Sequence, residues 1–233
     1  MIPIRDDAPR YGFPYINYFL LALNTLVFLY ELALAPRVRE LFVTQFGLVP
    51  AKILLALAGQ PHAELDKALI PVLTSMFLHA GFIHLLSNMW VLYIFGDNIE
   101  SYLGHFRFLL FYLLSGVSAT LVHLLFNLNS PLPTVGASGA IAGVMGAYFV
   151  LYPSARVLTI MPFFFLFFLW LPAWVVLGYW FLAQFLSGAA TTIAAAGRSV
   201  GGVAFWAHVG GFVAGIILIK LFPSHRRRFR YDN

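Results

Sequence analysis

Four polar side chains interrupt otherwise apolar stretches of this 233-residue chain, and their types are those of a hydrolytic site. Ser138 stands in the segment Gly-Ala-Ser-Gly, and His208 stands in Ala-His-Val-Gly-Gly. His84 and Asn88 are four residues apart, so they share one face of a helix. An imidazole can take a serine proton and return it to a leaving amine, while amide and N–H donors stabilise an oxyanion. The set therefore favours acyl-transfer chemistry.

The composition indicates where such a site would have to operate. Hydrophobic residues make up 61% of the chain and charged residues only 10%, against about 25% charged in a soluble domain. These figures exclude a soluble globular domain, a disordered chain and a coiled coil, and no basic stripe indicates a nucleic-acid partner. The chain has no cysteine, which excludes disulfides, thiolate metal ligands and a cysteine nucleophile. The sequence predicts an integral membrane protein.

The elements that must position these residues are membrane-spanning helices. A spanning helix needs about 20 mostly apolar residues, and we expect six of them. The predicted spans cover residues 17–35, 82–97, 108–126, 138–152, 162–187 and 199–219. The fourth is short, and a loop of small residues follows the fifth over residues 188–202. We expect an all-α polytopic bundle that forms a single domain over residues 1–233.

The distribution of basic residues predicts the orientation. Six spans place both termini on one side, where nine Lys and Arg residues face five on the other side. This bias favours a plasma (inner) membrane location with both termini in the cytoplasm. Residues 1–16 and the arginine-rich tail at 220–233 would then lie on the cytoplasmic side. Residues 36–81 then form an external segment on the membrane surface, in which Gly47 and Pro50 break any single long helix.

Depth arithmetic groups the four polar residues. At about 1.5 Å per residue, Ser138 and His208 lie roughly 21 and 18 Å above the cytoplasmic ends of their helices. Asn88 and His84 lie roughly 18 and 24 Å above the corresponding end of theirs. Three helices thus bring polar groups to similar heights in a core about 30 Å thick. No carboxylate lies deep in these segments, so we expect a Ser–His dyad, with backbone N–H groups at Ser138 as further oxyanion donors.

Taken in this order, the motifs resemble those of rhomboid intramembrane serine proteases over about residues 42–219. The resemblance rests on His79, His84, Asn88, Gly-Ala-Ser-Gly at 136–139, and Ala-His-x-x-Gly-x-x-x-Gly at 207–215. It implies that Ser138 is the nucleophile, His208 the general base, and His84 with Asn88 the oxyanion donors. The supporting positions are His79, Gly136, Gly139, Gly211 and Gly215. It also implies no cofactor or metal, and as partners transmembrane protein substrates and membrane lipids.

Two features depart from the family pattern. Ala142 stands where some members carry an aromatic residue that packs against the base, and the Trp-Arg pair of the first external loop is absent. The first departure leaves the packing of His208 open. His105 and His123 match no motif, and we interpret both as structural or interfacial.

Other functions remain open from the sequence. An inactive rhomboid-like protein would bind membrane clients without cleaving them, and a small transporter would use polar residues near the midplane. Ser138 alone would fit a small-residue packing stripe with Gly139 and Gly143. A metalloprotease would need zinc ligands, for which His79, His84 and His208 are candidates without a carboxylate or thiolate.

Hydrolysis also requires water at Ser138. We expect a cavity that opens to the external side and is closed beneath by the fourth and sixth helices. The fifth helix and the 188–202 loop are the expected lateral gate for substrates.

Overall fold

The computed structural model describes residues 1–61, 64–162, 166–195 and 203–224, and most of them are helical. The helices are α1 (Tyr15–Ala33), α2 (Pro36–Phe46), α3 (Pro50–Leu57), α4 (Leu65–Leu69), α5 (Pro71–Thr74), the 3₁₀ turn η1 (Ser75–Phe77), α6 (Phe82–Leu103), α7 (His105–Asn127), α8 (Ser138–Leu151), α9 (Ala173–Ala195) and α10 (Phe205–Leu221). The strands are β1 (Ile2–Asp6), β2 (Arg156–Pro162) and β3 (Leu166–Pro172).

Each of the six predicted apolar segments contains a helix, namely α1, α6, α7, α8, α9 and α10. Within the described ranges, α1, α7 and α9 are long and apolar enough to cross a membrane. A fourth candidate combines α6 with the helical stretch Leu65–Phe77, which is bent by 74° relative to it. α8 and α10 are apolar but have only 14 and 17 residues. The chain is thus a mostly helical, polytopic integral membrane protein. The start of the sixth predicted span at 199 and the tail arginines lie outside the described residues.

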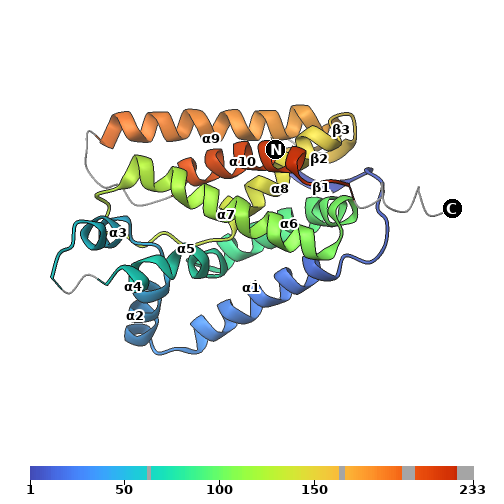
Figure 1. Ribbon diagram of the computed structural model, residues 1–233. Coiled ribbons are helices and arrows are strands. Elements are labelled where there is room, and N and C mark those ends of the chain that lie inside the picture. The colour runs from blue at the N-terminus through green and yellow to red at the C-terminus, as the bar shows by residue number, and fades with distance from the viewer. Residues whose placement is uncertain (62–63, 163–165, 196–202, 225–233) are drawn as a thin grey trace.

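The innermost helix is α8, which lies among α6, α7 and α10 (Figure 1). Every residue from Gly139 to Tyr148 is buried. Glycine and alanine predominate along this helix, and their small side chains let the neighbouring helices approach closely. α1 and α9 lie on opposite outer sides of this group (Figure 1).

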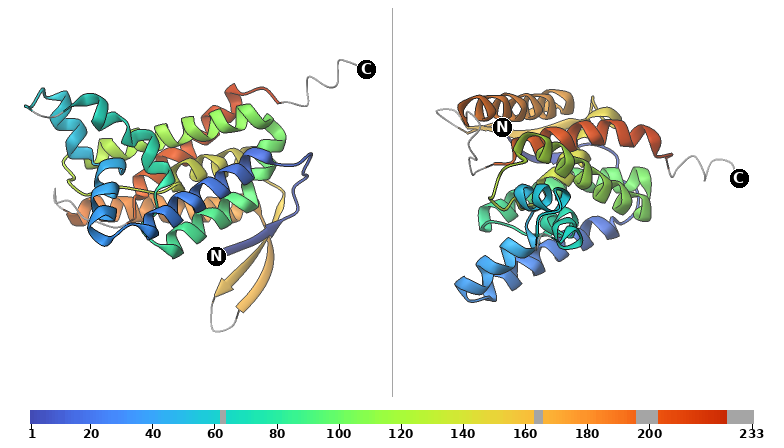
Figure 2. Two further views of the ribbon diagram at one scale, coloured as in Figure 1. Left: turned by 90° about the horizontal axis from the view of Figure 1, so that it is seen from below. Right: turned by 60° about the vertical axis from the view of Figure 1, so that its left-hand side comes forward.

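A three-stranded antiparallel sheet, in the order β1-β2-β3, corrects the all-α prediction. The fifth helix was predicted to start at residue 162, but α9 starts at Ala173, and a hairpin occupies the preceding segment. Its strands are rich in β-branched and aromatic side chains, which favour extended structure. Pro172 also disfavours helical dihedrals at the residue before it. The hairpin projects beyond the helices in the left view of Figure 2.

The carboxylate of Asp7, just after β1, binds the first residue of β2. Asp7 accepts hydrogen bonds from the backbone N–H and the Nε–H of Arg156, at 2.7 and 3.0 Å. The backbone N–H of Arg156 is the main reason that the pKa of Asp7 is lowered below its ordinary value. The carboxylate is therefore ionised at neutral pH and holds β1 beside β2.

The short helices between α1 and α6 occupy the end of the molecule opposite the sheet (Figure 1). The predicted breaks are confirmed, because α2 ends at Phe46, just before Gly47, and α3 begins at Pro50. Proline is compatible with the first turn of a helix, where its missing N–H would have no partner. This segment therefore forms a folded layer at the end of the molecule where α8 begins.

Candidate active site

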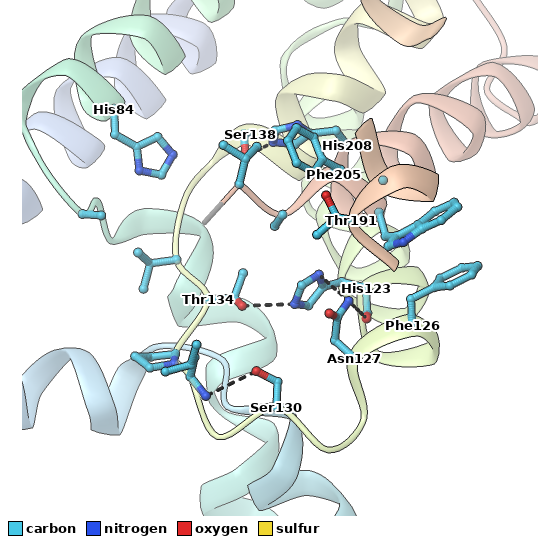
Figure 3. A pocket seen from close by; sticks show the side chains of 18 of the residues that line it. His84, His123, Phe126, Asn127, Ser130, Thr134, Ser138, Thr191, Phe205 and His208 are labelled. Carbon is cyan, nitrogen blue, oxygen red and sulfur yellow. Dashed lines mark hydrogen bonds between the residues drawn. The ribbon is translucent and has the colours of Figure 1, made fainter. Parts of the chain in front are cut away.

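Ser138 and His208 are in direct contact. Ser138 is the first residue of α8, and His208 lies within the first turn of α10. Nε2 of His208 lies 2.7 Å from Oγ of Ser138 (Figure 3), which is a hydrogen-bonding distance. The structure therefore pairs a hydroxyl with an imidazole although 70 residues separate them along the chain.

The close approach of α8 and α10 determines this distance. A Cβ atom at Gly211 would overlap the carbonyl oxygen of Gly139, and one at Gly215 would overlap that of Gly143. Only glycine permits two helix backbones to pack at such a separation. These predicted supporting glycines therefore set the spacing of the two helices that carry Ser138 and His208.

His84 approaches the serine across Gly136. Gly136 has a φ of 133°, a conformation that favours glycine. A Cβ atom at this position would lie 2.8 Å from Cε1 of His84 and 3.6 Å from Oγ of Ser138. The glycine thus leaves room for the imidazole of His84 beside the hydroxyl, and Figure 3 shows this ring on the side of Ser138 away from His208.

Asn88 lies one turn beyond His84 on α6, where it is 6% exposed. Its Nδ2 is buried and has no hydrogen-bond partner within the described part of the chain. A buried donor without a partner costs free energy, so this amide is suited to an acceptor that enters the site. The buried His79 stacks edge-on against His84 with ring centroids 5.2 Å apart, and its backbone N–H donates to Glu31.

The loop before Ser138 is fixed by contacts with other segments. Leu48 and Thr134 exchange two backbone hydrogen bonds of 3.0 and 2.7 Å. The N–H of Gly136 donates to the carbonyl of Ser75 at 2.9 Å. Nε2 of His123, which we interpreted as structural or interfacial, lies 3.1 Å from Oγ1 of Thr134 (Figure 3). The turn between α2 and α3, the 3₁₀ turn η1 and the helix α7 together hold the segment that leads to Ser138.

Ser138 and His208 line a cavity of about 720 Å³. Its walls come from α6, α7, α8, α9, α10 and the loop before α8, and they include His84 and Asn88. This volume lies within the range of about 300–1,000 Å³ that is typical of ligand sites. The four polar residues grouped by depth therefore share one cavity.

Two residues of α9 that the sequence analysis did not single out also contact His208. Oε1 of Gln184 lies 2.7 Å from Nδ1 of His208. The ring of Trp180 packs against the imidazole with centroids 5.8 Å apart, so the aromatic contact comes from α9. Ala142 faces Gly211 instead. Gln184 is the only side-chain amide in α9, which has no charged residue, and this amide in an apolar helix was the available signal.

The loop predicted over 188–202 is wrong in its first part, because α9 continues as a helix to Ala195. Residues 196–202 lie outside the described residues. The fifth predicted helix is therefore displaced toward the C-terminus by about ten residues relative to the prediction.

The three histidines considered as zinc ligands are used differently. Among the residues that the structure describes, no group of three His, Asp or Glu side chains could hold a metal ion. His208 bonds to Ser138 and Gln184, while His79 and His84 stack on each other. Within the described ranges, these three histidines therefore do not form a zinc-ligand set.

Comparison with known proteins identifies relatives of this chain. It is 32% identical to Rhomboid protein 1, mitochondrial, of Saccharomyces cerevisiae over 169 residues, which are 68% of this chain and 44% of that protein. It is 32% identical to Rhomboid-like protein 11, chloroplastic, of Arabidopsis thaliana over 162 residues, or 65% of this chain and 52% of that protein. It is 40% identical to Rhomboid protease GluP of Bacillus subtilis over 85 residues, or 36% and 16%. The chain spans about half or less of the length of these relatives.

A family model described as the Rhomboid domain matches residues 66–224. The match begins within α4 and ends after α10, so it includes Ser138, His208, His84 and Asn88. Because this match covers more than half of the sequence, the chain belongs to the rhomboid family.

Proposed function

We propose that this chain is an intramembrane serine endopeptidase that hydrolyses peptide bonds in or near transmembrane segments of other membrane proteins. The observation that carries the proposal is the 2.7 Å contact between His208 Nε2 and Ser138 Oγ in the wall of a cavity. Membership of the rhomboid family supports it, since a relative is named as a rhomboid protease. Membrane-protein substrates and surrounding lipids are the proposed partners.

In the proposed reaction, His208 acts as the general base. Its Nε2 accepts the hydroxyl proton while Oγ of Ser138 bonds to the scissile carbonyl carbon, whose π electrons move to the oxygen. The tetrahedral intermediate collapses, the C–N bond breaks, and the leaving amine takes the proton from His208. Water then gives a proton to His208 while its oxygen bonds to the acyl carbon. The second tetrahedral intermediate collapses, the bond from that carbon to Oγ of Ser138 breaks, and His208 returns the proton to Oγ as the carboxylic acid product leaves.

The oxyanion of each intermediate needs fixed donors. The unpartnered Nδ2 of Asn88 and an N–H of His84 come from α6, and the first N–H groups of α8 come from Ser138 and its neighbours. The positive end of the α8 dipole points toward the same place. These donors cost little reorganisation because α6 and α8 already hold them before substrate arrives.

The proposal includes six membrane-spanning helices, with both termini in the cytoplasm of an inner or plasma membrane and the cavity open to the external side. At about 1.5 Å per residue, α8 and α10 are roughly 21 and 26 Å long, which is shorter than a core of about 30 Å. Short helices in the middle of the bundle would leave Ser138 below the membrane surface, where a water-filled cavity must reach it. Substrate would enter laterally beside α9.

The test is cleavage of a single-span model substrate by the purified protein in detergent. We expect Ser138→Ala or His208→Ala to abolish cleavage, and the double variant to be little worse, because the two groups act as one unit. Ser101→Ala is the control, since that hydroxyl bonds to Tyr11 near the far end of α6. Cleavage by the Ser138→Ala protein would overturn the proposal.

Two further outcomes would identify the alternatives. A wild-type protein that binds the model substrate without cleaving it would be an inactive client-binding protein. Cleavage that stops on addition of a metal chelator would indicate a metal-dependent reaction. Neither result is expected if Ser138 and His208 perform the chemistry.

A further inference from the structure

The imidazole of His208 has a second polar partner. Nδ1 lies 2.7 Å from Oε1 of Gln184, on the side of the ring opposite Ser138. Gln184 belongs to α9, whereas His208 belongs to α10 and Ser138 to α8. Both ring nitrogens are therefore engaged, each by a different helix.

The two contacts match the tautomer that a general base needs. A general base needs a free lone pair on Nε2, so the proton of the neutral imidazole must be on Nδ1. An amide oxygen is an acceptor and favours that tautomer by receiving the Nδ1–H bond. In serine hydrolases with a triad, a carboxylate holds the histidine in this way. Here a neutral amide takes that position.

The neighbouring turns of α9 support the same contact. Trp180, one turn before Gln184, packs on the ring of His208. Gly188, one turn after, leaves room for Phe205, because an added Cβ would lie 3.3 Å from the Cβ of that residue. Positions at intervals of four lie on one helix face, so this face of α9 is shaped to the first turn of α10.

We propose that Gln184 is the positioning residue for His208, so that the orientation of the base depends on how α9 packs against α10. The inference rests on the proposed function, since it assigns a role in the same reaction. Gln184 bonds to His208 and is not among the residues that line the cavity. It acts through His208 alone.

The protonation of His208 can be followed through the pH dependence of kcat/KM. Within the described residues, His84 of α6 and His123 of α7 are the titratable side chains that act on it electrostatically, while Ser138 of α8 and Gln184 of α9 bond to it. Gln184→Glu places a negative charge beside Nδ1, which stabilises the imidazolium. The acid limb of the kcat/KM profile should therefore move to higher pH.

The experiment compares three variants of the full chain on a labelled single-span model substrate in detergent. Gln184→Met keeps the side-chain length but removes the acceptor, and we expect kcat to fall about tenfold with KM unchanged. Gln184→Glu should shift the acid limb. Thr192→Val is the matched control, because it removes another α9–α10 hydrogen bond, from Trp206 Nε1, and should leave the acid limb in place.

A second readout does not depend on activity. In protein with ¹⁵N-labelled histidine, the His208 signals, assigned by their loss in His208→Asn, should show a protonated Nδ1, and this preference should weaken in Gln184→Met. Wild-type protein that cleaves nothing but shows the tautomer change would refute the protease proposal and keep this inference. Gln184→Met and Gln184→Glu profiles that match Thr192→Val, with unchanged nitrogen signals, would overturn it.

Discussion

Two helices pack against α10 in different ways. α8 meets it backbone to backbone, since a Cβ atom at Gly211, Gly215 or Gly146 would overlap a carbonyl oxygen of the facing helix. α9 contacts α10 through side chains, as in the hydrogen bond between Oε1 of Gln184 and Nδ1 of His208. The α8–α10 contact therefore has almost no freedom to shift, whereas the α9–α10 contact can change by side-chain rotation.

This difference assigns tasks to the two contacts. Ser138 and His208, the proposed nucleophile and base, lie on the pair of helices that cannot separate without loss of packing. The residues that contact His208 from its other side lie on the outer helix α9, many of whose side chains, including Trp174, Leu182 and Ile193, are exposed on the protein surface. In the proposed reaction, a laterally entering substrate displaces α9 while the Ser138–His208 distance is kept, and the return of α9 restores the contact between Gln184 and His208 before the chemical step.

The largest effect is expected from removal of the Asn88 amide, a hydrogen-bond donor that the buried helix α6 holds in place. Asn88 lies on α6, whose Leu92 and Phe95 are fully buried against the core, so its amide is preorganised. We expect Asn88→Ala to lower kcat by about 10²–10³ with little change in KM, because the amide acts on the oxyanion. Turnover and melting temperature are measured on the same preparation.

The structural alternative for Asn88 predicts the opposite result. An amide that serves only as a contact between helices contributes about 1 kcal/mol or less. Its loss would then lower the melting temperature and leave the turnover of the folded protein near the wild-type value. That outcome would remove Asn88 from the site.

The next effect compares the same substitution in the α8–α10 contact and on the outer helix α9. In Gly215→Ala the new methyl group meets the Gly143 carbonyl, and overpacking against a backbone should lower the free energy of unfolding by about 1–3 kcal/mol. In Gly178→Ala, where α9 faces α8, the nearest atom is 3.7 Å away, on Phe149 of α8, and alanine favours a helix. We expect only the first variant to melt at a lower temperature in detergent. Equal losses in the two variants would contradict the comparison.

Much of the helical framework could be predicted from the sequence. Apolar runs of suitable length located six helices, and Gly47 and Pro50 located the break between α2 and α3. The hairpin could not be found this way, because an apolar run fits a buried helix and a strand equally well. β1 depends on pairing between residues 2–6 and 157–160, which are far apart along the chain.

The residues of the site were grouped by their expected heights along the helices, and the structure brings Ser138 and His208 into contact. Their chemical roles stay predictions. Gln184 was missed because height alone gives no rotation of a helix about its axis. The start of its helix was also placed about ten residues too early, so the face that α9 turns toward α10 could not be deduced.

The smallest expected effect comes from joining α9 to α10. A Cβ atom at Gly188 would lie 3.3 Å from the Cβ of Phe205, near the 3.5–4.5 Å that disulfides take, and the chain has no cysteine of its own. We expect the oxidised Gly188→Cys/Phe205→Cys protein to cleave a single-span substrate several-fold more slowly, because α9 can no longer swing aside. A reductant should restore the rate.

The same crosslinked protein distinguishes gating from damage to the chemistry. A small fluorophosphonate reaches Ser138 without displacement of α9, so its labelling rate should be equal before and after oxidation if the base keeps its orientation. The single-cysteine proteins, treated with the same oxidant, are the controls for modification of the thiols. Loss of labelling together with loss of cleavage would show that the bond disturbs His208 through Gln184 and not the entry of substrate. An unchanged cleavage rate with a confirmed crosslink would mean that substrates enter elsewhere. The prediction that α9 moves aside to admit them would then be wrong.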